Sequence, residues 1–176
     1  MVNAIRRAAV LLAAASLLGI AGVAVAQQAP AQPDKEDVDV TSYQDWEVRC
    51  LKSSNPQQCE MTQLIKSADS GSPVMRVVLG YPKQIDTAAM IFILPLGTQL
   101  VPGLSLSVDG GQAQRIPFQA CLPNGCRADL PVKPALMNKL KHGGKATVTI
   151  VGPRGKKMNL DISLMGFTAA NKAIAE

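Results

Sequence analysis

The sequence predicts an all-β protein, in which two antiparallel sheets pack as a sandwich with one or two short helices. Two features of the chain predict this fold. From Asp45 onward, apolar and polar residues alternate with a period of two in about nine segments, which is the pattern of half-buried strands. Gly, Pro, Asn and Ser separate these segments, as turns separate the strands of a sandwich. With 176 residues, the chain accommodates one such domain and a processed N-terminal segment.

Residues 1–26 have the pattern of a secretory signal peptide, and we expect them to form a helix until they are removed. A short basic start precedes a long apolar run, and Ala24 and Ala26 supply the A-x-A motif of signal peptidase. Cleavage is therefore predicted between Ala26 and Gln27. A membrane anchor is the alternative, since about 20 apolar residues span a bilayer. The run is rich in Ala and Gly, where an anchor would carry Leu and Ile, and this favours cleavage.

The next segment, residues 27–42, is expected to be a disordered linker because its Gln, Pro and acidic residues leave little to bury. The sandwich domain then occupies residues 43–176. The whole chain carries a net charge of +5, and signal cleavage removes two of its arginines. The remaining excess is small and scattered, and its densest run, GPRGKK, has the composition of a solvated turn. The charge therefore gives little support for an anionic partner.

The predicted strands follow the alternation along the chain, and most of them have one apolar face. They are Met75–Leu79, Met90–Leu94, Leu104–Val108, Ile116–Ala120, Ala146–Ile150 and Met158–Leu164. The segment MIFIL, residues 90–94, is apolar throughout, which predicts a central strand that is covered on both faces. The Asp109-Gly110 turn separates the third and fourth of these strands and predicts that they form a hairpin.

Two short helices interrupt the strands. Pro134 is suited to open the first helix and Gly143 to cap its end, while the tail from Thr168 to Ala175 has helical composition. The single histidine, His142, then lies at a helix C-terminus, where a basic side chain interacts favourably with the helix dipole. We expect it to be an exposed residue and not a ligand.

The sequence predicts no enzyme, cofactor or metal site. A Ser-His-Asp triad needs a histidine in a catalytic setting, and a zinc site needs C-x2-C pairs or several histidines. The run HGGKAT, residues 142–147, lacks the first glycine and the Lys-Ser/Thr ending of a phosphate-binding loop. Aromatic residues make up 3% of the chain, too few for the stacking surface of a nucleic-acid binder. Nucleic-acid binding is therefore not expected.

Four cysteines, Cys50, Cys59, Cys121 and Cys126, remain after signal cleavage. An even number of cysteines in an exported chain argues for disulfides. Four cysteines allow three connectivities, and the sequence does not choose among them. Local pairing, Cys50 with Cys59 and Cys121 with Cys126, is the simplest.

The stretch CLPNGC, residues 121–126, favours a hairpin tip that is closed by a disulfide. Pro123 occupies the second position of the turn and Gly125 the fourth, as in a type I turn. The two cysteines would then oppose each other on neighbouring strands. The alternatives are half of a metal site, or a thiol-exchange site that uses Cys121 and Cys126. Thiol-exchange sites of the thioredoxin type place C-x-x-C at a helix start, and this stretch has neither that spacing nor that setting.

The order and spacing of several short motifs resemble those of the invasion associated locus B family. The motifs are DWEVRC (45–50), LPLG (94–97), SVDGG (107–111), PFQAC with NGCRA (117–128) and SLMGF (163–167). The resemblance covers nearly the whole mature domain. It implies an exported bacterial protein with an immunoglobulin-like β-sandwich, in a family named for the entry of an intracellular pathogen into red blood cells. It implies structural residues and no catalytic ones: the four cysteines as bridge residues, Trp46 as a core aromatic, and Gly97, Gly110 and Gly125 as turn residues.

Together these features predict an exported, non-enzymatic interaction protein in the periplasm, or secreted to the outer surface, of a Gram-negative bacterium. Its partner is expected to be a protein of the envelope or of a host cell surface, bound through loops or by strand addition to an open sheet edge. Membrane contact is expected only through the signal segment, if that segment is not cleaved. A periplasmic protein for envelope maintenance or stress is the second hypothesis, and a thiol-exchange protein that uses Cys121 and Cys126 is the third.

Overall fold

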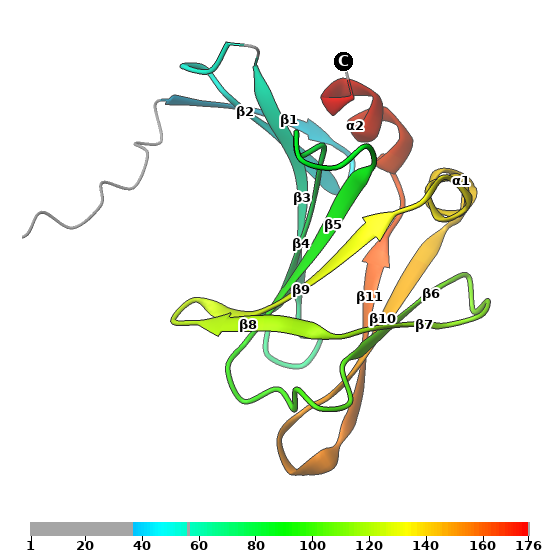
Figure 1. Cartoon of the computed structure of the whole chain (residues 1–176). Coiled ribbons are helices and arrows are strands. Elements are labelled where there is room, and N and C mark those ends of the chain that lie inside the picture. Colours follow the sequence, from blue (N-terminus) through cyan, green and yellow to red (C-terminus); the bar gives the residue numbers. More distant parts are fainter. Residues whose placement is uncertain (1–36, 56, 176) are drawn as a thin grey trace, which may run out of the picture. The chain divides into compact units, whose positions relative to one another are not determined.

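Two antiparallel sheets face each other across one hydrophobic core in the computed structural model of the protein (Figure 1). The structure describes residues 37–55 and 57–175. The predicted signal peptide, its cleavage point after Ala26 and the first ten residues of the predicted linker lie outside the described residues. Within the described part of the chain, the predicted sandwich of antiparallel sheets with two short helices is confirmed.

The larger sheet has seven strands, and its first five follow one another as a meander. In spatial order the strands are β1 (Val38–Tyr43), β2 (Trp46–Leu51), β3 (Gln58–Lys66), β4 (Pro73–Gly80), β5 (Ala88–Leu94), β9 (Gly125–Val132) and β8 (Phe118–Leu122). Each strand runs antiparallel to its neighbours. The sheet therefore ends in β1 on one side and in β8 on the other.

The smaller sheet has four strands, and two helices close one end of the sandwich (Figure 1). In spatial order the strands are β11 (Lys157–Ser163), β10 (Lys145–Val151), β6 (Leu104–Val108) and β7 (Gln114–Ile116). The helices are α1 (Pro134–His142) and α2 (Phe167–Ile174), and a 3₁₀ turn, η2 (Pro153–Gly155), lies between β10 and β11. This sheet ends in β11 and β7.

Alternate residues of the strands point into the core, as the two-residue period predicts. Phe92 of β5 and Val148 of β10 have no exposed surface. β5 is an internal strand, as predicted for MIFIL, because β4 and β9 pair with its two sides. Its outward residues Ala89, Ile91 and Ile93 are only half-buried, however. The predicted cover on both faces is therefore wrong for the described residues.

The predicted strand at 116–120 is wrong in one respect, because the chain changes sheets at Pro117. Leu104 pairs with Ile116, so the predicted hairpin with 104–108 is confirmed up to that residue. Beyond it, Phe118 begins β8, which pairs with β9 in the larger sheet. Proline has no N–H to donate to a ladder, and the single predicted strand breaks at that residue.

The predicted linker is also wrong in its last part, since residues 38–42 belong to β1. β1 pairs with β2 along its whole length, from Val38 opposite Leu51 to Tyr43 opposite Trp46. The composition of residues 27–42 as a whole hides this strand, in which Val38 and Val40 alternate with Asp39 and Thr41. β-Branched residues favour the extended backbone, and the adjacent β2 supplies the hydrogen-bonding partner that an isolated segment lacks.

Both helices lie close to their predicted positions. α1 begins at Pro134, and the N–H of Gly143 donates to the Lys139 carbonyl oxygen at 2.8 Å. α2 begins at Phe167, one residue before the predicted start. The Phe167 ring meets the Trp46 ring edge to face, with centroids 5.3 Å apart and an angle of 82° between the planes. α2 is thereby packed onto the end of the core that β2 contributes.

Candidate functional site

The four cysteines form two disulfides, and the local pairing is confirmed. Cys50 of β2 is bonded to Cys59 of β3, and Cys121 of β8 is bonded to Cys126 of β9. In each pair the two residues are directly opposite in the strand register. Each bridge therefore fixes one pair of neighbouring strands in the larger sheet.

The CLPNGC stretch forms the hairpin tip that its turn residues predict. Leu122 pairs with Gly125, and Pro123 and Asn124 form the turn between them. Gly125 has a φ of 136°, and a Cβ at this position would lie 2.5 Å from the Leu94 carbonyl oxygen. Glycine is therefore required at this position, where the hairpin packs closely against the end of β5.

The other residues singled out as structural lie at turns or in the core. Trp46 is fully buried, and its Nε1–H donates to the Ser163 carbonyl oxygen at 2.9 Å. Gly97, in the turn after β5, has a φ of 93°, and Gly110, in the turn after β6, has a φ of 71°. These positions hold the fold in place and do not gather around a common cavity.

No three metal-ligating side chains come together in residues 37–55 and 57–175. His142 is exposed at the end of α1, and its Nδ1 lies 2.8 Å from the Asn138 carbonyl oxygen. Its position at the helix C-terminus is as predicted. Among these same residues, no helix is long and apolar enough to cross a membrane.

Two side chains have shifted pKa values, and both take part in ion pairs on the surface. The hydrogen bond from Arg127 Nε to Asp129 Oδ1, 2.6 Å long, raises the pKa of Arg127. Hydrogen bonds from Lys145 and Thr147 lower the pKa of Asp161. Neighbouring groups explain both shifts, so neither indicates an acid or a base that is poised for catalysis in a cleft.

Two shallow grooves lie on the surface. One, of about 370 Å³, lies between the β6–β7 turn and α1 and includes Leu106, Gln112, Lys133 and Lys139. The other, of about 390 Å³, lies on the outer face of the larger sheet and includes Leu64, Arg76 and Ile93. Neither groove has a histidine or a carboxylate among its lining residues.

The edge of β1 is the most distinctive feature of the surface. The Lys52 N–H donates to the Asp37 carbonyl oxygen at 2.9 Å, which makes this a hydrogen-bonded pair. In an antiparallel ladder such pairs occur at every second residue, so Asp39, Thr41 and Tyr43 also bond to β2. The backbone N–H and C=O groups of the residues between them, Val38, Val40 and Ser42, point away from β2.

No strand of the described chain pairs with this outer side of β1, which forms the end of the larger sheet. Unpaired backbone groups on an edge strand form a template for another chain. The pairing of β1 with β2 has no bulge, and β1 contains no proline. Val40 is 54% exposed, so an apolar side chain is also accessible on this strand.

The other three sheet edges are bulged, short or bonded at one end. β8 has a bulge between Phe118 and Ala120, and the Gln119 side chain accepts a hydrogen bond from the Asp129 N–H at 2.7 Å. β7 has only three residues and ends at a proline. At the end of β11, the Gln63 side chain bonds to the backbone of Ser163. β1 therefore offers an edge of six residues that is open along its whole length in the described chain, whereas β11 is bonded at its last residue.

An apolar patch on the outer face of the larger sheet begins two strands away from β1. Leu64 of β3 is 44% exposed, and the outward residues Val78 of β4 and Ile91 and Ile93 of β5 are half-buried. In the strand register Val78 lies opposite Ile91, while the exposed Arg76 lies between Leu64 and Ile93 and adds a cation to the patch. An exposed patch of this kind is typical of a contact surface.

A comparison with known protein families matches residues 46–175 to the model described as "Invasion associated locus B (IalB) protein". The chain belongs to the invasion associated locus B family. Two relatives, each named an invasion protein B homolog, come from Brucella abortus strain 2308 and Brucella abortus biovar 1 strain 9-941. Each is 32% identical over 133 residues, which cover 73% of this chain and 75% of the relative.

A solved structure, that of the invasion associated protein b from Bartonella henselae, has the same fold. Its TM-score is 0.65 at 20% identity, over 78% of this chain and 96% of that one.

The family match contains both disulfides and Trp46, whereas β1 precedes the matched residues. The β1 edge is therefore the part of the site that sequence reasoning missed, and the alternation in VDVTSY is the signal that could have revealed it.

Proposed function

We propose that this member of the invasion associated locus B family is an exported, non-enzymatic interaction protein that binds an extended segment of another protein along β1. The observation that carries the proposal is the row of outward backbone groups at Val38, Val40 and Ser42. A peptide strand that pairs with them gains main-chain hydrogen bonds, while alternate side chains give specificity. The partner is a protein of the bacterial envelope or of a host cell surface.

The proposed location is the periplasm or the outer surface of a Gram-negative bacterium. The two disulfides support it, because such bridges persist in oxidising compartments. The predicted signal peptide supports it as well. The names of the Brucella abortus relatives, invasion protein B homologs, suggest that the interaction contributes to host-cell invasion in pathogens.

A proline at position 40 tests the proposal. Val40→Pro removes an outward N–H and places a ring on the open edge, while the hydrogen bonds to β2 belong to other residues. Val40→Thr is the matched control, since it keeps the N–H and the β-branched shape. Circular dichroism and intact disulfides establish that both variants fold.

The measurement is the capture of partners from envelope and host-membrane extracts by the two variants and the unmodified protein. A partner that is retained by Val40→Thr and lost by Val40→Pro supports strand addition. If all three proteins capture the same partners equally well, β1 is not the binding edge.

The two other hypotheses remain predictions, each with its own test. A role in envelope maintenance requires that deletion of the gene weakens the envelope of a bacterium that has no host. A thiol-exchange role requires the bridge between β8 and β9, so the double variant Cys121→Ser, Cys126→Ser would abolish it. Strand addition to β1 predicts that the same double variant keeps its partners.

A further inference from the structure

The loop between β5 and β6 exposes three large aliphatic side chains. Val101 is 89% exposed, the largest fraction among the large hydrophobic residues of the described chain, while Leu96 is 60% and Leu100 45% exposed. We call these three residues the apolar tip. Exposed apolar surface is unfavourable in water, and several exposed aliphatic side chains on one loop indicate a surface that contacts another phase or molecule.

Hydrogen bonds hold the loop in the conformation that exposes the apolar tip. Arg115 Nε donates to the Pro102 carbonyl oxygen and Arg115 Nη2 to that of Val101, both at 2.7 Å. The Gln99 N–H donates to the Val151 carbonyl oxygen at 2.9 Å and fastens the loop to the end of β10. The exposure of the tip is thus built into the fold.

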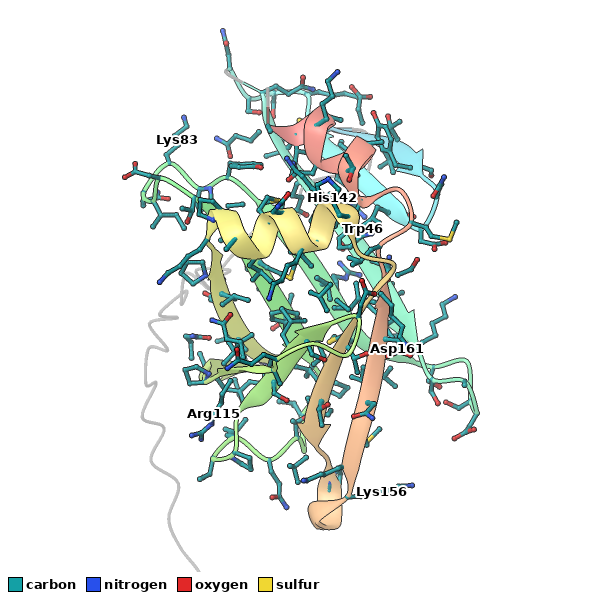
Figure 2. The ribbon with its side chains drawn as sticks, turned by 90° about the vertical axis from the view of Figure 1, so that its right-hand side faces the viewer. Trp46, Lys83, Arg115, His142, Lys156 and Asp161 are labelled. Carbon is teal, nitrogen blue, oxygen red and sulfur yellow. A yellow bond between two sulfur atoms is a disulfide. The ribbon has the colours of Figure 1, made fainter. Side chains whose placement is uncertain are left out.

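Basic side chains lie at the same end of the molecule. Lys156 and Lys157 are exposed at the β10–β11 turn, which the Gln99 hydrogen bond to the end of β10 places beside the loop. Figure 2 shows Lys156 and Arg115 both in the half of the molecule away from the helices, Lys156 at its tip and Arg115 on the opposite side. Neither 95–103 nor 152–157 contains Asp or Glu. The apolar tip therefore projects from a surface of positive charge.

We propose that the apolar tip inserts into the surface of an anionic lipid bilayer. The aliphatic side chains would enter the boundary between headgroups and acyl chains, while Lys156 and Lys157 stay at the level of the phosphates. Arg115 already satisfies two carbonyl groups of the loop, which lowers the cost of moving this backbone out of water.

The composition favours a bilayer over a protein as the occupant. Contact surfaces between proteins are enriched in aromatic residues and depleted in lysine. The turn beside the loop is rich in lysine, which argues for the bilayer. This contact differs from the sequence-based expectation, in which the protein contacts a membrane only through the signal segment, and only if that segment is not cleaved. It is independent of the β1 edge, which has different residues.

Flotation of the exported protein with vesicles tests the proposal. Vesicles of phosphatidylcholine that contain phosphatidylglycerol should bind the protein at low salt, and vesicles of phosphatidylcholine alone should bind it weakly. Val101→Ser should weaken the binding roughly tenfold, since one valine-sized side chain no longer enters the apolar phase. Lys156→Gln should weaken it about fivefold, since one cation is lost near an anionic surface.

Two matched variants serve as controls away from the apolar tip. Met165→Ser removes an aliphatic side chain that is 61% exposed between β11 and α2, and Lys83→Gln removes a cation between β4 and β5. Both should bind as the unmodified protein does. All variants share one N-terminus, so a difference among them reports on the tip even if the signal segment is retained.

The depth of insertion is measured with a fluorescent residue on the loop. Trp46 is the single tryptophan and is fully buried, so the indole that Val101→Trp introduces can be followed by difference. Brominated lipids in the vesicles should quench it. If the indole is not quenched, if both vesicle types bind equally, or if Met165→Ser loses as much binding as Val101→Ser, the proposal is wrong.

Discussion

Gln63 joins the two sheets through a single side chain. Its Nε2 donates to the Ser163 carbonyl oxygen at 3.1 Å, and its Oε1 accepts from the Ser163 N–H at 3.0 Å. The amide thus forms with Ser163 the same two hydrogen bonds that a neighbouring strand would form. Gln63 is buried and Ser163 is half-buried, so water has limited access to these two hydrogen bonds.

Loss of this amide should therefore destabilise the protein. Gln63→Ala is expected to lower the free energy of unfolding by about 1–3 kcal/mol, because the Ser163 N–H loses its partner, while the Ser163 carbonyl oxygen keeps the bond from Trp46. Urea denaturation measures the change. Gln58→Ala, an exposed position on the same strand, should change it by less than about 0.5 kcal/mol. Equal effects would contradict the role given to Gln63.

Gly166 allows the turn from β11 into α2. Its φ is 83°, and a Cβ there would overlap the Tyr43 carbonyl oxygen. Gly110 has a similar φ of 71° with open space around it. Gly110→Ala should cost about 1–2 kcal/mol for the left-handed backbone alone, and Gly166→Ala clearly more because β1 must move. Thermal unfolding of the two variants compares them, and a smaller loss for Gly166→Ala would contradict this account.

At the scale of the elements, one ion pair predicts a dependence on pH. Hydrogen bonds from Lys145 and Thr147 across the β10–β11 ladder lower the pKa of Asp161 below its ordinary value of 3.8. The ionised Asp161 carboxylate therefore stabilises the folded state above pH 3.8. This stabilisation is lost as the pH falls through the lower pKa that Asp161 has in the folded state. The pair is exposed, so it is worth at most about 1 kcal/mol.

Asp161→Asn isolates this contribution. The variant should be less stable than the unmodified protein at neutral pH, and the difference should shrink at acid pH, where the carboxyl group is protonated. Denaturation curves at the two pH values measure it. A difference that is the same at both would assign the effect to something other than the charge.

Most elements follow from the sequence because they depend on local signals. The alternation in β10 and β11, the proline and glycine that bound α1, and the turn residues of CLPNGC each act within a few residues. The sheet change at Pro117 depends instead on which strand accepts Phe118, a long-range choice. β1 depends on β2 in the same way, and the linker-like composition of residues 27–42 as a whole hides it.

At the scale of the whole molecule, the mass of the intact protein tests both the cleavage of the signal peptide and the oxidation of the cysteines. The exported protein should begin at Gln27, and alkylation should modify no cysteine until the protein is reduced, after which it should modify four. Mass spectrometry of the intact protein before and after reduction measures both. Retention of residues 1–26 would favour a membrane anchor, and cysteines that alkylate without reduction would contradict the two closed bridges.

The sequence predicts the type of binding site, an open sheet edge, but not its position. An exported sandwich with open edges follows from the signal pattern and the strands, but the sequence does not indicate which edge is open. That depends on the bulge in β8, the shortness of β7 and the Gln63 bond to β11, all of which arise from tertiary pairing. The apolar tip is similarly hidden, because Leu96, Leu100 and Val101 resemble core residues in sequence.

The central claim is that the outward side of β1 binds a partner strand, and amide hydrogen exchange tests it most directly. The partner that Val40→Thr retains would be added to the labelled protein, and exchange would be followed residue by residue. We predict that the amides of Val38, Val40 and Ser42 become protected on binding, because they gain hydrogen bonds. Protection confined to the outer sheet face or the apolar tip, with these three amides unchanged, would contradict the claim.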